Sequence, residues 1–188
     1  MDIAQFKFMP MDTYNTYFKY IALAHFDRFM SANVWLNDSN QYEDISPAEY
    51  IRRYLTAVES LNNVIEYFYH EHNIPESDDI VSVKDFRGRV QGKWGELKGI
   101  ADIANAYKHC SRDKQRTSLI AKAKDIFEIP SIYDWRRSEG STTTRALLCR
   151  LVPDEYIEAL VNGVNFWKNL IHENKNDQLI IFMYKNTK

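Results

Sequence analysis

The stretch of residues 46–72 constrains the fold of this chain more than any other, because it predicts one long amphipathic helix. Ser46, Pro47 and Glu49 supply a cap, a first-turn proline and a carboxylate three residues after the cap, which together mark a helix start. Apolar side chains then hold one face for about six turns. They are Ile51, Tyr54, Leu55, Val58, Leu61, Ile65 and Phe68. An apolar face of that length must pack against other helices, so it predicts a helical bundle.

Three further helices and short polar loops predict one mainly α domain over residues 1–188. One helix covers about residues 12–33 with Asp12 as its N-cap, a second covers about 82–110, and the last opens at Pro153. The apolar content of 45%, with five prolines and six glycines, suits a hydrophobic core and argues against disorder. We therefore expect a bundle of about four or five long helices.

Residues 117–152 have the most ambiguous pattern in the chain. The apolar spacing of residues 120–127 allows a helix, whereas the alternation of residues 147–151 fits a half-buried strand. Residues 137–144 are rich in turn-forming side chains. We favour two short strands here, with a third near residues 179–184. The expectation is a small β-hairpin inserted between the fourth helix and the C-terminal helix.

Charge and cysteine content narrow the classes of protein that the chain could belong to. The formal net charge of −2 excludes a globally basic nucleic-acid binder, although it leaves room for a local basic patch. Two cysteines far apart in sequence, Cys110 and Cys149, fit a reducing compartment better than a disulfide framework. The first residues lack the pattern of a signal peptide, and no window reaches the ~18 apolar residues of a membrane span. We expect a cytoplasmic protein that does not enter a membrane.

Residues 101–113 hold the main cluster of chemically active side chains. Asp102, Asn105, Lys108 and His109 offer a carboxylate, an amide, an ammonium and an imidazole, which could support acid–base or phosphate chemistry. A helical projection at ~100° per residue gives two faces. One holds Ile100, Ile103, Ala104 and Tyr107, and the opposite one holds Lys98, Asp102, Asn105, His109 and Arg112. The simpler alternatives are a solvated surface, or polar contacts to the backbone of a nearby loop.

Four glycines recur beside this cluster at spacings of four, three and four residues: Gly88, Gly92, Gly95 and Gly99. Each costs a helix interior about 1 kcal/mol relative to alanine, so their presence in one line needs a reason. One reason is close approach by a second helix or a second subunit. The other is a break between two shorter helices in residues 88–95.

The run from Asp102 to His109, DIANAYKH, lies in a long helix after two earlier long helices and before a hairpin-like tract and a closing helix. In this motif and this order of elements the chain resembles bacterial proteins related to the HEPN superfamily. HEPN proteins are small helical bundles, often dimeric. Many of them are, or resemble, metal-independent ribonucleases of toxin–antitoxin and other defence systems. The resemblance implies a HEPN-like bundle and a homodimer.

The catalytic HEPN pattern, an arginine upstream of a histidine on one helix, is not present in this chain. The positions five to seven residues before His109 hold Asp102, Ile103 and Ala104. RNA cleavage by the 2'-hydroxyl needs a base and positive charge. The candidate site therefore has His109, Asn105 and Asp102 as catalytic residues and Lys98, Lys108 and Arg112 as substrate-binding residues.

Two functions follow from these observations. We favour an interaction or regulatory module, in a toxin–antitoxin or phage-defence context, that binds a partner protein, RNA or a nucleotide. The alternative is a metal-independent ribonuclease with a degenerate site centred on His109. No metal or cofactor is expected. His70 and His72 lie ~200° apart on a helix and so do not share an ion, and the chain has no glycine-rich phosphate loop.

Overall fold

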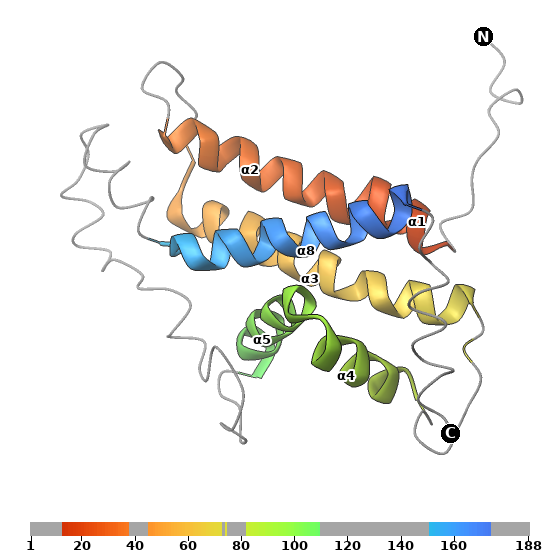
Figure 1. Cartoon of the computed structure of the whole chain (residues 1–188). Helices are drawn as coiled ribbons and strands as arrows, with labels where there is room; N and C mark the ends of the chain where they lie inside the picture. The colour runs from red at the N-terminus through yellow and green to blue at the C-terminus, as the bar shows by residue number, and fades with distance from the viewer. Residues whose placement is uncertain (1–12, 38–44, 73, 75–81, 110–150, 174–188) are drawn as a thin grey trace, which may run out of the picture.

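The computed structural model describes residues 13–37, 45–72, 74, 82–109 and 151–173, and the regular elements in these ranges are all helices. Their apolar side chains share one hydrophobic core. Figure 1 shows α8 crossing in front of α3, with α2 on one side of this pair and α4 and α5 on the other. The mainly helical fold expected from the sequence is therefore confirmed.

The first helix begins at Tyr14 and ends at Asn37, with a π-helical turn inside it. It consists of α1 (Tyr14–Tyr17), the π-helix η2 (Phe18–Ala22) and α2 (Leu23–Asn37). Thr13 is the N-cap, because its hydroxyl accepts a hydrogen bond from the Thr16 N–H at 3.1 Å. The expected cap, Asp12, lies outside the described residues. The helix extends four residues beyond the expected end at Asn33.

Helix α3 (Pro47–Glu71) is the longest in the described part of the chain, and it begins where the sequence predicts. The Ser46 hydroxyl accepts a hydrogen bond from the Glu49 N–H at 3.2 Å, and Pro47 occupies the first turn. The predicted apolar face is buried, from Tyr54 to Phe68. Burial extends further around the helix than the pattern indicates, because α3 packs against α2 on one side and α5 on another.

The helix expected over residues 82–110 is two helices, α4 (Val83–Lys93) and α5 (Gly95–His109). Trp94 separates them, with an extended backbone at φ −112° and ψ 108°. Its N–H closes α4 by donating to the Val90 carbonyl at 3.0 Å, and its own carbonyl accepts the first N–H bonds of α5. Of the two explanations for the glycines, a break between shorter helices is thus correct for this region.

Helix α4 is fastened to α3 by two polar contacts. Arg87 forms an ion pair with Glu66, and the Gln91 amide donates to the Asn62 side-chain oxygen at 3.2 Å. Burial lowers the pKa of the Arg87 guanidinium from its usual value. These contacts join α4 to α3, against which α5 also packs.

Helix α8 (Asp154–His172) completes the core. Tyr54 of α3 donates its hydroxyl hydrogen to the Tyr156 carbonyl at 3.0 Å. Gly163 is the point of closest packing. A Cβ at Gly163 would lie 2.8 Å from Ile100 Cγ1 and 3.0 Å from Leu61 Cδ2, which is closer than real Cβ contacts allow. Only glycine therefore lets α8 approach α3 and α5 at this depth.

The expected β-hairpin is outside the described residues except at its end. Leu151 and Val152 are buried in a turn that leads into α8, so Leu151 is not part of a strand as expected. The strands expected elsewhere in residues 117–152 and near 179–184 stay predictions. Among the helices that the structure describes, none combines the length and the apolar character needed to cross a bilayer.

Candidate functional site

The polar residues singled out in the sequence lie on α5, but they do not form one solvent-facing row. Asp102 is only 4% exposed, whereas Asn105 and Lys98 are half-buried. The projection correctly put Asp102 opposite Ile100, but that side of α5 is not open to solvent. Every residue from Gly99 to Ala104 is buried, so the middle of α5 is covered on several sides.

Tyr107 is more exposed than its place in the projection indicates. It was placed on the same face as the buried Ile100 and Ile103, yet it is 47% exposed. Its neighbour Ala106 is fully buried, so the buried side of α5 has shifted away from Tyr107 at this point of the helix.

The remaining candidate residues lie at or beyond the end of α5. Lys108 and His109 are its last two residues, and their side chains are outside what the structure describes. Arg112 lies outside the described residues altogether. The structure thus brings Asp102 and Asn105 together on adjacent turns, and the combination of these residues with His109 stays a prediction.

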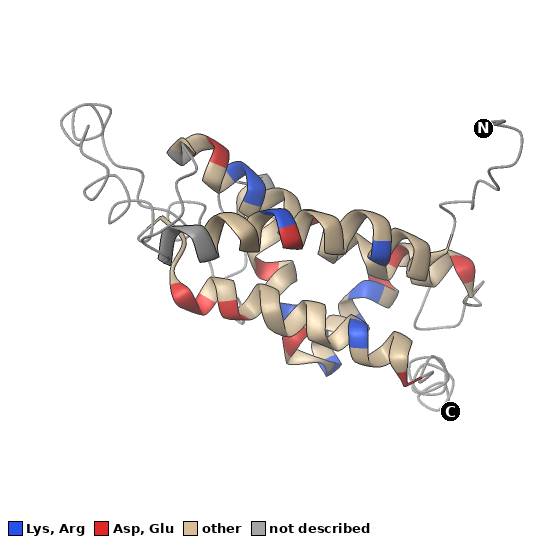
Figure 2. Cartoon of the chain, turned by 90° about the horizontal axis from the view of Figure 1, so that it is seen from above, with Lys and Arg blue, Asp and Glu red and all other residues tan. Residues whose placement is uncertain are grey.

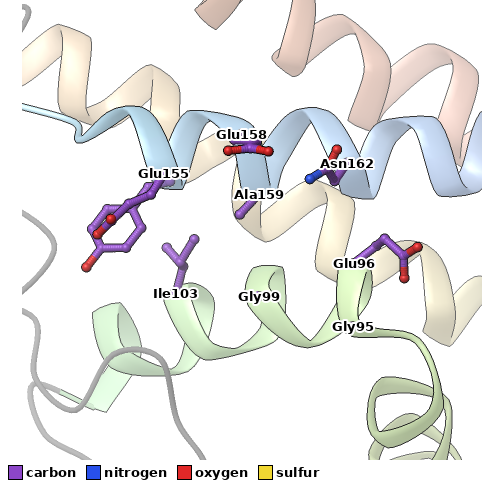
Figure 3. Close-up of a pocket in the computed structure, with 9 residues that line it drawn as sticks. Gly95, Glu96, Gly99, Ile103, Glu155, Glu158, Ala159 and Asn162 are labelled. Atoms are coloured by element: carbon purple, nitrogen blue, oxygen red, sulfur yellow. The ribbon is translucent and has the colours of Figure 1, made fainter.

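A hollow with a volume of about 210 Å³ lies between α5 and α8. Its lining consists of Gly95, Glu96, Gly99 and Ile103 from α5 and of Glu155, Tyr156, Glu158, Ala159 and Asn162 from α8. We call this the α5–α8 groove. In Figure 3, Ile103 and Ala159 project into the space between the two helices, which makes the floor apolar.

The groove owes its shape to small residues. A Cβ at Gly99 would lie 3.4 Å from the Ala159 Cβ, so the two helices approach closely there. Of the four glycines in the line, Gly99 lies near a second helix, and this contact would still leave room for a Cβ. At Gly88, Gly92 and Gly95 an added Cβ would meet nothing within 4 Å.

Carboxylates surround the apolar floor. Figure 3 shows Glu155 at one end of the groove, Glu96 near the other end, and Glu158 with Asn162 along the α8 side. Lysine and arginine are absent from the first half of α8, whose acidic residues are drawn red in Figure 2. None of the three glutamates forms an ion pair with another described residue.

The positions of these carboxylates have a local cause. Glu96 lies in the first turn of α5 and Glu155 in the first turn of α8, where negative charge interacts favourably with the helix dipole. This interaction offsets part of the repulsion that arises when the two acidic helix starts line one hollow. The result is a negatively charged rim around an apolar surface.

This arrangement suits binding better than catalysis. The lining, as far as the described residues form it, contains no histidine, cysteine, serine or lysine that could act as a nucleophile or a basic partner. The described residues also contain no group of three or more histidine, cysteine, aspartate or glutamate side chains placed to hold a metal ion. The groove offers an apolar contact and negative charge.

The sequence pattern indicates one wall of this groove but not the other. The glycine spacing pointed to Gly95 and Gly99. On α8, the available signal was the spacing of Glu155, Glu158 and Asn162, which puts them on one side of a helix. That the two helices lie side by side could not be read from either segment alone.

Comparisons with known proteins do not assign the chain to a family. No protein-family model matches it, and neither the curated proteins nor the solved structures contain a significant match. The resemblance to the HEPN superfamily therefore stays a prediction.

Proposed function

We propose that the protein is an interaction module that binds a segment of a partner protein in the α5–α8 groove. The observation that carries the proposal is the groove itself, an apolar floor ringed by three carboxylates that lack ion-pair partners among the described residues. Apolar surfaces rimmed by polar residues are typical of interaction sites. The resemblance to HEPN bundles, which are often dimeric and occur in toxin–antitoxin and other defence systems, supports the same class of function.

Charge argues against RNA as the ligand of this groove. A phosphate backbone needs lysine, arginine or backbone N–H groups. Glu96, Glu155 and Glu158 would instead repel it. The alternative of a ribonuclease centred on His109 concerns a different part of α5 and stays a prediction.

The proposal can be tested with a bulky substitution that fills the groove and leaves the hydrophobic core unchanged. Asn162 lines the groove and is exposed, so Asn162→Trp should fill the hollow and leave the buried face of α8 intact. Asn165 is exposed on the same helix and does not line the groove. Asn165→Trp is therefore a matched control.

The measurement is selection of peptides from a displayed random library on the immobilised wild-type chain, followed by binding of each selected peptide to both variants. We expect selected peptides to bind wild type and Asn165→Trp and to lose binding to Asn162→Trp. Selection without enrichment, or peptides that bind Asn162→Trp as well as wild type, would contradict the proposal. Circular dichroism of both variants shows that the fold is retained.

A further inference from the structure

The lining of the α5–α8 groove also indicates the chemistry of its partner. The floor of Gly99, Ile103 and Ala159 can accept an apolar side chain, while Glu155 and Glu96 lie toward the two ends (Figure 3). A segment that suits both features carries an apolar side chain between basic ones. We propose that the partner binds through a cationic amphipathic segment, with lysine or arginine facing the glutamates; this inference rests on the proposed function.

The argument is one of charge complementarity. Glu155 and Glu158 lie three residues apart on α8, where like charges destabilise a helix. Among the residues that the structure describes, the lining supplies no positive charge to offset them. A basic side chain from a partner would remove that repulsion on binding, whereas an acidic or phosphorylated segment would increase it.

The apolar floor of the groove indicates that the partner needs an apolar side chain as well as positive charge. A simple cation would remain hydrated above the carboxylates, because exposed ion pairs contribute little. An apolar side chain seated against the partly exposed Ala159 would bury its own apolar surface, which adds a favourable contribution to that of charge. The bare backbone at Gly95, with nothing within 4 Å of an added Cβ, leaves room for the partner chain beside the floor.

The experiment uses two defined probes and the full chain. One fluorescein-labelled peptide carries leucine at helical spacing with lysine at its polar positions, and a matched peptide carries glutamate in place of every lysine. Fluorescence anisotropy measures binding of each. We expect the lysine peptide to bind and the glutamate peptide not to bind, with affinity for the lysine peptide falling as salt rises.

Neutralising the rim tests where the lysine peptide binds. The double variant Glu155→Gln, Glu158→Gln should weaken binding about tenfold, and Asn162→Trp should abolish it. Asp27→Asn removes a charge from the exposed surface of α2 and should leave binding unchanged. Equal binding to wild type and to the double variant would overturn the inference, because it would show general attraction of a basic peptide to an acidic protein.

Different results would contradict the proposed function and the inference about the chemistry of the partner. If library-selected peptides bind the groove but are apolar or acidic, and the lysine peptide does not bind, the inference is wrong and the proposed function stands. If Asn162→Trp weakens the binding of no peptide, whether selected from the library or designed, then both the proposed function and the inference about the partner are wrong. A wild-type dimer in analytical ultracentrifugation that dissociates in Asn162→Trp would show that a second copy of the chain fills the groove, and would also overturn the inference.

Discussion

Two glycines show how strongly the effect of a single residue depends on its surroundings. Gly163 and Gly92 both lie inside helices, where glycine costs about 1 kcal/mol relative to alanine. A Cβ at Gly163 would overlap Ile100 and Leu61, whereas a Cβ at Gly92 would meet nothing within 4 Å. The same substitution should therefore have opposite effects at the two positions.

We expect Gly163→Ala to lower the free energy of unfolding by about 1–3 kcal/mol, because the added methyl group overpacks the contact between α8, α5 and α3. Gly92→Ala should raise it by about 0.5–1 kcal/mol, because alanine restricts the unfolded chain and adds no clash. Urea denaturation followed by circular dichroism measures both. A Gly163→Ala protein as stable as wild type would show that α8 does not pack at this depth.

The burial of Asp102 shows what a helical projection cannot predict about a single residue. The projection of α5 placed it opposite Ile100, and that angular relation is correct for any helix. Whether the opposite side meets solvent depends on neighbouring parts of the chain, and Asp102 is in fact buried. A one-helix projection cannot distinguish a surface helix from one that is covered on several sides.

At the scale of the elements, helix starts could be predicted and the helix break could not. The Ser46 cap depends on residues within one turn, so the sequence alone locates it. The glycines of residues 88–95 fit both a continuous helix and a break. The structure breaks the helix at Trp94, whose ring contacts that of Phe166 from α8 at 5.8 Å between centroids, a contact that sequence reasoning does not include.

The start of α3 also carries a charged cluster that links two helices. Glu49 accepts hydrogen bonds from Arg53 at 2.9 Å and Arg52 at 2.7 Å, and it contacts Arg28 of α2 at 3.4 Å. The hydrogen bonds from Arg53 and Arg52 lower the pKa of the Glu49 carboxyl below its usual value. Because Glu49 is partly exposed, solvent screens these interactions.

The lowered pKa predicts a pH dependence of stability. A carboxyl whose pKa is lower in the folded state stabilises the fold above its unfolded pKa of about 4.3 and loses this effect as pH falls through the folded value. We therefore expect wild type to be more stable than Glu49→Gln at neutral pH, with the difference shrinking as pH falls below about 4.3. Denaturation midpoints across this pH range provide the measurement. A difference that does not change with pH would rule out the ionised carboxylate as its source.

At the scale of the whole molecule, the sequence predicted a bundle but not its arrangement. Apolar periodicity identifies helices and their buried faces, and this is why the mainly α fold was correct. The α5–α8 groove was not foreseen, because its walls come from residues 95–103 and 155–162. Only tertiary packing makes these two segments neighbours.

The placement of charge over the molecule leads to an expectation about RNA. We expect labelled RNA to stay intact when incubated without metal with wild type or with His109→Ala, because the positions five to seven residues before His109 hold no arginine and Asp102 is buried. Denaturing gel electrophoresis over a time course is the measurement. Cleavage by wild type that is lost in His109→Ala would instead support the ribonuclease hypothesis.

The hydrogen bond from Tyr54 to Tyr156 spans 102 residues of sequence, and it joins the first half of the chain to the last helix. During synthesis on the ribosome, α3 and α5 emerge long before α8 does. Until then Ile100 and Leu61 have no Gly163 backbone to pack against. The nascent chain therefore leaves the surface of Ile100 and Leu61 that faces Gly163 uncovered until α8 emerges, and exposed apolar surface of this kind favours aggregation.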